Sequence, residues 1–185
     1  MNKALDTLYS LYQKTFGEQE YIFGHGQEDA RIVLIGEAPG KDEVLQGKPF
    51  VGKAGQQLTA FFDSIGYGRQ QLFITNAIKY RIFKTNPITL RKSNRPALRH
   101  ELLANVSFLK SELALLAPQV IITLGNVPLQ TVTGDLSMKI GLHHAKPFSF
   151  NIGERSVPIF PLYHPASIIY NQQLKAIYEN DLQLL

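Results

Sequence analysis

The segment Ile32-Val-Leu-Ile-Gly-Glu-Ala-Pro-Gly40, followed seven residues later by Gly47-Lys-Pro-Phe-Val-Gly52, decides the fold of this chain. Its unbroken apolar run is typical of a strand buried on both faces, as in a parallel sheet. The glycines and the proline that follow predict a loop, because glycine tolerates unusual φ values and proline fixes its own. Loops at such strand ends hold the ligand in open α/β sheets. The run therefore delivers the carboxylate of Glu37 to a candidate ligand-binding edge.

Length and composition predict one domain spanning residues 1–185. The chain has 185 residues, of which 44% are hydrophobic, and this is enough to bury one core. No stretch approaches the ~20 apolar residues of a membrane span, and charged residues near the amino terminus leave no apolar signal-peptide region. The chain has no cysteine and so forms no disulfide, which suits a cytoplasmic protein.

Apolar patterning predicts the order of strands and helices. Four apolar segments, 32–35, 72–75, 120–124 and 157–160, are expected to be strands, and helical spacing predicts helices between them and at both ends. This alternation indicates an α/β fold, a three-layer α/β/α sandwich around a central, mainly parallel four-stranded sheet. Residues 81–96 are predicted to form a long irregular loop, a kind of segment that is usually functional or disordered.

Several of these segments resemble the uracil-DNA glycosylase superfamily, specifically its bacterial and archaeal family 4 type. The resemblance rests on the two glycine-rich stretches quoted above, on Phe73–Lys79 and on Tyr163–Ser167, in the chain order of the family. It covers roughly residues 22–182, with no insertion or deletion needed across residues 36–76. It implies an enzyme that hydrolyses the bond between uracil and deoxyribose in single- or double-stranded DNA.

The resemblance assigns Gly36, Phe50 and Asn76 to uracil binding. An enzyme that acts on a base flips it out of the stack and holds it in a pocket. Phe50 is expected to stack on the uracil ring, as aromatic faces hold bases elsewhere. Asn76 can accept a hydrogen bond from uracil N3–H and donate one to O4, which cytosine does not allow. Without the motif, Phe50 would be interpreted as a core residue and Asn76 as an Asx turn after a strand.

Catalytic roles fall, by the same resemblance, to Glu37, Glu43 and His164. Breaking the N-glycosidic bond leaves positive charge on the sugar and negative charge on uracil, so a carboxylate and a hydrogen-bond donor stabilise the transition state. Glu37 is expected to orient the water and stabilise the sugar cation, with Glu43 supporting that water. His164 is expected to donate to uracil O2. Taken alone, a histidine before a proline is more often structural, and the sequence leaves the protonation state of His164 open.

One cofactor of the family has no ligands in this chain. The family binds a [4Fe–4S] cluster through four cysteines, and the sequence contains none. Tyr80 and Asn105 fall at two of the ligand positions, and the amino-terminal pair falls near Tyr9 and Tyr12. We therefore expect no metal and no cofactor, with larger side chains filling the place of the cluster.

A basic segment lies between Asp63 and Glu101. This interval contains eight basic residues and no acidic one, whereas the rest of the chain has eleven basic against fifteen acidic residues. Such asymmetry suits contact with a phosphate backbone, although a solvated surface has the same composition. The residues expected to contact DNA are Lys84, Arg91, Lys92, Arg95, Ser167 and Tyr170, the last of which replaces an arginine of the family.

These observations predict a monomeric, metal-free and monofunctional uracil-DNA glycosylase that leaves an abasic site. Asn94 stands where a related branch carries a histidine that traps DNA covalently, so covalent trapping is not expected. Two alternatives stay open. One is a glycosylase of the same fold for another deaminated base, such as hypoxanthine or xanthine, against which the uracil-matching amide of Asn76 argues. The other is a DNA-binding module without catalysis, against which the joint presence of the site residues argues.

Overall fold

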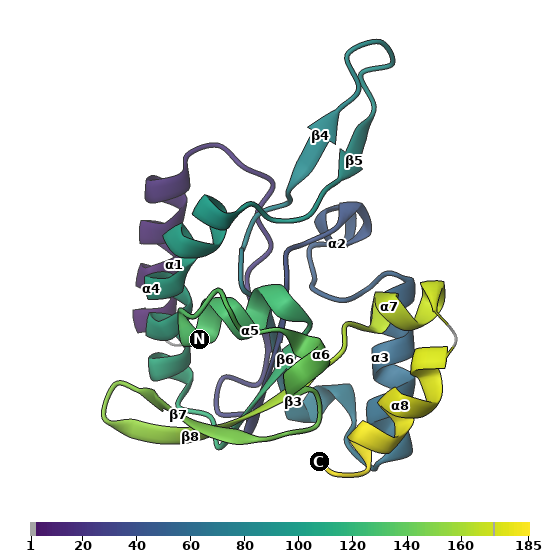
Figure 1. Cartoon of the computed structure of the whole chain (residues 1–185). Coiled ribbons are helices and arrows are strands. Elements are labelled where there is room, and N and C mark those ends of the chain that lie inside the picture. The colour runs from purple at the N-terminus through teal and green to yellow at the C-terminus, as the bar shows by residue number, and fades with distance from the viewer. Residues whose placement is uncertain (1–2, 172) are drawn as a thin grey trace.

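A central six-stranded sheet lies between two layers of helices (Figure 1). The computed structural model describes residues 3–171 and 173–185. The strands follow the order β1-β3-β2-β6-β8-β7. Their bounds are β1 His25–Gly26, β2 Ile32–Gly36, β3 Leu72–Asn76, β6 Val120–Leu124, β7 Phe148–Ile152 and β8 Arg155–Leu162. The inner strands β3, β2, β6 and β8 are parallel, and the two edge strands are antiparallel to their neighbours.

The predicted fold class is confirmed, and the predicted number of strands is wrong. The four predicted strands are the four parallel ones, whose side chains are covered on both faces and so form continuous apolar runs. Both edge strands lacked that signal. β1 contains only two residues, and β7 alternates between half-buried and exposed positions along most of its length.

The helices divide between the two faces of the sheet (Figure 1). One face packs against α1 (Lys3–Phe16), α4 (Arg99–Leu116) and α5 (Asn126–Thr133), and the other against α3 (Lys53–Ser64), α7 (Pro165–Tyr170) and α8 (Gln173–Leu182). Two short helices, α2 (Lys41–Gln46) and α6 (Ile140–His143), and the 3-10 turn η1 (Arg69–Gln71) complete the set. Within residues 3–171 and 173–185, no helix combines the length and apolar character needed to cross a membrane.

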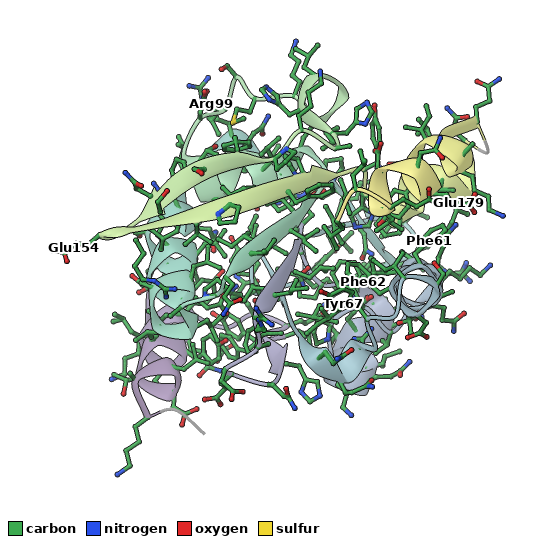
Figure 2. All side chains as sticks on the ribbon, turned by 90° about the horizontal axis from the view of Figure 1, so that it is seen from below. Phe61, Phe62, Tyr67, Arg99, Glu154 and Glu179 are labelled. Atoms are coloured by element: carbon green, nitrogen blue, oxygen red, sulfur yellow. The ribbon has the colours of Figure 1, made fainter. Side chains whose placement is uncertain are left out.

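Alternate residues of each strand supply the two cores. On β2, Val33 and Ile35 pack toward the α1, α4 and α5 layer, whereas Ile32 and Leu34 pack toward the α3, α7 and α8 layer. Figure 2 shows Phe61 and Phe62 of α3 in the interior of the molecule, and Glu154 at the outer end of the β7–β8 turn. This packing fixes the strands rigidly, so the residues at their carboxyl ends have fixed relative positions.

Residues 81–96, predicted to be irregular, contain a β-hairpin. Its strands β4 (Phe83–Thr85) and β5 (Lys92–Asn94) pair antiparallel, and the hairpin stands out from the body of the molecule (Figure 1). The Asn86 side chain closes the tip by accepting hydrogen bonds from the backbone N–H groups of Ile88 and Thr89, both at 2.9 Å. The prediction missed the hairpin because its strands are short and exposed, so no apolar pattern marks them.

A buried ion pair joins the end of β3 to α4. Lys79 Nζ lies 2.5 Å from Glu112 Oε2 and also donates to the Thr75 hydroxyl and to the carbonyl of Asn76. Glu112 accepts further hydrogen bonds from the hydroxyls of Thr75 and Tyr9. Burial lowers the pKa of Lys79 and the Glu112 carboxylate opposes that shift. The network therefore holds α1, β3 and α4 together directly beneath Asn76.

Removing one charge of this pair should destabilise the fold strongly. Lys79→Met leaves the Glu112 carboxylate buried without its cation, and we expect the free energy of unfolding to fall by about 3–5 kcal/mol in urea denaturation. Lys79→Met/Glu112→Leu should recover much of that loss, since apolar side chains of similar volume replace such pairs well. The control Lys175→Met breaks an exposed pair with Glu179 and should cost less than about 0.5 kcal/mol. A Lys79→Met variant as stable as the parent would contradict the assignment.

Candidate active site

The candidate site lies where the parallel strands end. Glu37 follows the last residue of β2, Asn76 is the last residue of β3, and His164 comes two residues after β8. The strand register pairs Gly36 directly with Asn76. Because β3, β2, β6 and β8 are parallel and adjacent, their carboxyl ends meet at one edge of the sheet. The sequence placed each of these residues at the end of a strand, and the structure brings the ends of those strands to one edge of the sheet.

The Phe50 ring and the Asn76 amide both pack closely against the backbone of Gly36. A Cβ on Gly36 would lie 2.4 Å from Phe50 Cζ and 2.5 Å from Asn76 Oδ1, so only glycine fits there. The ring centroids of Phe50 and His164 are 6.0 Å apart. Phe50 and Asn76 are only 6% and 3% exposed, respectively. Both groups are therefore largely shielded from solvent.

The backbone at Phe50 is held in an unusual conformation. Its φ of 54° lies in the left-handed region, which is uncommon for a bulky residue and costs on the order of 1–3 kcal/mol. The Arg69 guanidinium donates to the carbonyls of Pro49 and Phe50, and a Cβ on Gly55 would lie 1.9 Å from the Phe50 carbonyl oxygen. Sequence reasoning counted Arg69 only as one of the basic residues and missed its role in shaping this loop, because no local pattern marks it.

The Glu37 carboxylate is partly buried and has one backbone donor. Its Oε1 accepts a hydrogen bond of 3.0 Å from the N–H of Ala97, in the segment between the hairpin and α4. Burial raises the pKa of Glu37, and the nearby Glu101 carboxylate raises it further, while the Ala97 hydrogen bond acts in the opposite direction. The Ala97 contact could not be predicted, because it joins residues 60 positions apart. A desolvated carboxylate of this kind is suited to accepting a proton from water.

His164 is positioned as a neutral hydrogen-bond donor. Its Nδ1 accepts a hydrogen bond of 3.1 Å from the Ala166 N–H and so caps α7, which places the ring proton on Nε2. Burial lowers the pKa of His164 to about 4. Gly125 lies beside His164 at a φ of 92°, a backbone conformation that favours glycine. The hydrogen bond at Nδ1 and the lowered pKa both favour the neutral ring.

Two other predicted site residues, Glu43 and Ser167, form hydrogen bonds with residues three positions away in the chain. Glu43 Oε2 accepts a 3.0 Å hydrogen bond from the Gly40 N–H and so satisfies one backbone donor at the start of α2. Ser167 lies in the first turn of α7, where its N–H donates to the His164 carbonyl. The side chain of Tyr170 lies outside the described residues. Glu43 therefore shapes the loop that carries Glu37, and its support of a catalytic water stays a prediction.

The predicted DNA-contacting cations of the hairpin fall into two groups. Arg95 makes a bidentate pair with Glu101, both contacts at 2.8 Å, and Lys92 Nζ lies 2.7 Å from Glu20 Oε1. Lys84 and Arg91 are exposed and have no ion pair with any residue that the structure describes. Lys84 and Arg91 are therefore available to an external phosphate, whereas Lys92 and Arg95 already have carboxylate partners.

Aromatic and amide side chains occupy the positions that the resemblance assigns to cluster ligands. The Tyr12 hydroxyl donates to Asn105 Oδ1 and accepts a 2.9 Å hydrogen bond from the Lys79 N–H. The Tyr12 and Tyr80 rings are 6.4 Å apart within a larger aromatic cluster. An iron–sulfur cluster is held by thiolates, and these hydrogen-bonded phenol and amide groups do not fit it. Across residues 3–171 and 173–185, no three His, Cys, Asp or Glu side chains form a metal-binding group.

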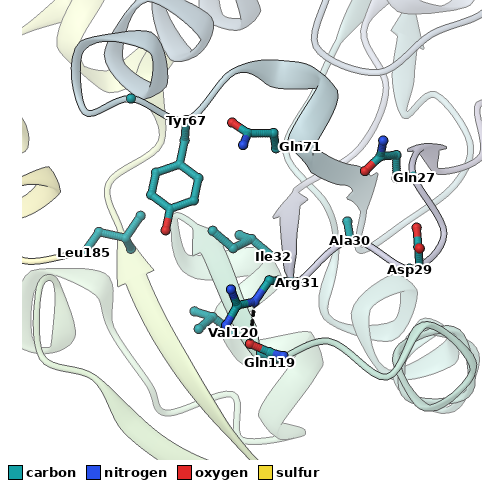
Figure 3. Close-up of a pocket in the computed structure, with 11 residues that line it drawn as sticks. Gln27, Asp29, Ala30, Arg31, Ile32, Tyr67, Gln71, Gln119, Val120 and Leu185 are labelled. Carbon is teal, nitrogen blue, oxygen red and sulfur yellow. Dashed lines mark hydrogen bonds between the residues drawn. The ribbon is translucent and has the colours of Figure 1, made fainter.

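A separate cavity of about 550 Å³ lies at the opposite edge of the sheet (Figure 3). It is lined by Ile32 and Val120, which begin β2 and β6, and by Tyr67, Arg31 and Gln119. Arg31 Nε donates to Gln119 Oε1 at 2.7 Å within it. Ligands of parallel α/β sheets bind at the carboxyl ends of the strands, so this cavity is not the candidate active site.

Comparisons with known proteins show the family to which the chain belongs. The sequence pattern of the Uracil DNA glycosylase superfamily matches residues 23–183. The chain is 36% identical over 164 residues to a type-4 uracil-DNA glycosylase of Saccharolobus solfataricus, covering 86% of this chain and 72% of that protein. It is 34% identical over 166 residues to the type-4 enzyme of Archaeoglobus fulgidus, covering 88% and 79% of the two chains. For the type-4 enzyme of Thermotoga maritima the identity is 30% over 164 residues, with coverages of 88% and 79%.

The titration of His164 tests the geometry of the site directly. Since burial disfavours the imidazolium, we expect the NMR shifts of this ring to stay constant between about pH 5 and pH 8 and to move only near pH 4. The unfolded chain binds the proton more readily, so this group contributes stability above about pH 6.5 that is lost as the pH falls toward 4. His100, an exposed histidine, is the internal control. Titration of His164 near pH 6.5 would show an open, solvated ring.

Proposed function

Because the chain belongs to the uracil DNA glycosylase superfamily, we propose that it hydrolyses the N-glycosidic bond of uracil in DNA, releasing uracil and leaving an abasic site. The observation that carries the proposal is the joint placement of Glu37, Phe50, Asn76 and His164 at the carboxyl ends of adjacent parallel strands. A carboxylate, an aromatic ring, an amide and a neutral imidazole are the groups that binding and cleaving a uracil nucleotide require.

Recognition of the base is assigned to Phe50 and Asn76. The Asn76 amide makes no side-chain hydrogen bond to another described residue, so both its oxygen and its nitrogen are available to a ligand. Its neighbours at Gly36 and Phe50 fix its place. In our proposal the amide oxygen accepts from uracil N3–H and the amide nitrogen donates to O4, while the Phe50 ring packs on the base.

Bond cleavage is assigned to His164 and Glu37. As uracil departs, negative charge grows on its O2, and the Nε2–H of neutral His164 stabilises that charge by a hydrogen bond without transferring its proton. The Glu37 carboxylate stabilises the sugar cation and orients the water that attacks C1′. This water loses a proton, for which the desolvated carboxylate is the acceptor.

The proposal includes a single hydrolytic step without a metal cluster. A glycosylase that also cuts the strand needs a free amine to form a Schiff base with the sugar. Lys79 is the lysine beneath Asn76, and its ammonium is held by Glu112 and two further acceptors, which makes it a poor nucleophile. Tyr12, Tyr80 and Asn105 take the structural place of the iron–sulfur cluster. We therefore propose a monofunctional enzyme acting as one domain.

A panel of oligonucleotides carrying uracil, hypoxanthine or xanthine tests the function. We expect single-turnover release of uracil alone, and we expect Glu37→Gln and His164→Ala each to slow it by on the order of 10²–10³-fold, the loss typical of one preorganised charge-stabilising group. Affinity for uracil-containing DNA should change much less, because both groups act mainly in the transition state. The parent rate should also fall as the pH drops through the raised pKa of Glu37.

Each other outcome of this panel has a definite meaning. Release of hypoxanthine or xanthine in preference to uracil would select the glycosylase for another base. DNA binding without release of any base would select the non-catalytic module. Variants that cleave as fast as the parent would show that the roles of Glu37 and His164 are wrong.

Asn76 decides the choice of uracil over cytosine. Cytosine offers an acceptor at N3 and a donor at C4, so it would face the fixed amide with both groups mismatched, at a cost of about 1–3 kcal/mol each. Asn76→Asp should lose most uracil release and gain slight cytosine release, because its carboxylate accepts from the cytosine amine. Asn76→Ala should lose uracil release without that gain. Full uracil release by both variants would remove Asn76 from base recognition.

The free cations of the hairpin should dominate the salt dependence of DNA binding. Lys84→Ala/Arg91→Ala is expected to weaken binding equally for all sequences and to reduce the slope of log affinity against log salt by about 0.7–0.9 per lost contact. Lys92→Ala should have a smaller effect, because this side chain already pairs with Glu20. Lys175→Ala, on α8, is the control. Unchanged affinity and slope in the double variant would show that the hairpin is only solvated.

A further inference from the structure

The tip of the hairpin exposes two large apolar side chains. Ile88 is 89% exposed and Leu90 is 75% exposed, the two highest values among the large hydrophobic residues that the structure describes. Both leave their apolar surface in water, where it contributes nothing to the stability of the fold. Two large apolar groups exposed within one tight turn, with basic residues on both sides in the chain, mark a candidate contact surface.

The tip is built rigidly. Asn86 Oδ1 accepts from two N–H groups of the turn, the Leu90 N–H donates to the Asn86 carbonyl at 2.9 Å, and the Asn86 N–H donates to the Arg91 carbonyl at 3.0 Å. Pro87 fixes its own φ. These bonds hold Leu90 at φ 54°, a strained value for a leucine. The two side chains are therefore presented in a fixed shape, so little conformational entropy is lost when they bind.

The surroundings of the tip are basic and connect to the active site. Lys84 and Arg91 flank it and are free of ion pairs within the described chain. At the base of the hairpin, Asn94 Nδ2 would lie 3.2 Å from a Cβ on Gly40, in the loop that carries Glu37. Ala97, just beyond the hairpin, donates to Glu37 itself. A nucleic acid bound at the active site therefore meets the hairpin.

The reach of the hairpin matches the depth of a DNA groove. Strands rise about 3.3 Å per residue, so the three paired residues and the turn place the tip roughly 10–15 Å beyond the base of the hairpin. The grooves of B-DNA are about 7.5–8.5 Å deep. A tip of this length can contact the base stack while Lys84 and Arg91 contact the phosphates on either side.

We propose that Ile88 and Leu90 form an apolar wedge that inserts into the base stack of duplex DNA beside the flipped nucleotide. This inference rests on the proposed glycosylase function. Apolar side chains between base steps compensate for the stacking that is lost when a base leaves the helix. A single strand needs no such compensation, since its bases are already free to leave the stack. The wedge should therefore act on duplex substrates and leave single-stranded substrates unaffected.

The test compares Ile88→Ser/Leu90→Ser with the parent on uracil in duplex and in single-stranded oligonucleotides. We expect the variant to release uracil from duplex about tenfold more slowly or worse, equivalent to at least ~1.4 kcal/mol, with the single-stranded rate within about twofold. Leu90→Gly is a second variant, because glycine adopts the positive φ of the turn without strain and removes only the side chain. Leu184→Ser removes a leucine that is 68% exposed beside the opposite, carboxyl-terminal end of the chain, and should change neither rate.

A binding assay separates this proposal from the proposed function. A duplex with uncleavable 2′-fluoro-deoxyuridine beside 2-aminopurine should brighten when the parent binds, because 2-aminopurine fluoresces when unstacked, and the double variant should lose this signal. The wedge is wrong if the signal persists in the double variant, or if duplex and single-stranded rates fall equally. Unaltered behaviour on all DNA would instead assign the tip to contact with another protein. Failure of the parent to release uracil from either substrate would overturn the proposed function, while the fluorescence still decides on the wedge.

Discussion

The ammonium of Lys79 and the carboxylate of Glu112, 2.5 Å apart in the interior, set the position of the end of β3. Two buried charges are tolerated only when their remaining hydrogen-bonding capacity is filled, and here Thr75, Tyr9 and the Asn76 carbonyl fill it. The pair thereby binds α1 and α4 to the strand that presents Asn76. Asn76 is therefore held on two sides. The Lys79–Glu112 pair holds its backbone, and Gly36 and Phe50 lie against its side chain.

Much of the fold could be predicted from short-range patterns, and the candidate site residues came from the resemblance of the motifs to the family. The four parallel strands are continuous apolar runs, and each candidate group is placed by its distance from the end of such a run. Glu37 follows Gly36, Asn76 ends β3, and His164 precedes the proline that begins α7. Since parallel strands end at the same edge, knowing the strands was sufficient to bring these residues together, as the structure confirms.

The remaining features depend on contacts that no local pattern encodes. Glu37 receives its hydrogen bond from Ala97, and Arg69 holds the strained Phe50 loop from nearly twenty residues away. The hairpin was missed because both its strands are exposed, and the edge strand β7 because it alternates in burial. Charge counting treated the basic segment as uniform, whereas the structure divides it into cations paired with Glu20 or Glu101 and cations that are free.

The hydrogen bonds of Tyr12 join three elements of the fold through one side chain. In the family that this chain resembles, a cluster ties together segments far apart in the sequence. Here the Tyr12 hydroxyl on α1 accepts from the Lys79 N–H after β3 and donates to Asn105 on α4, so one phenol links three elements. The rings of Phe16, Tyr80 and Phe108 pack around it and exclude water, which strengthens those hydrogen bonds. Such a cross-link needs neither iron nor thiolates, and its strength is independent of the redox state of its surroundings.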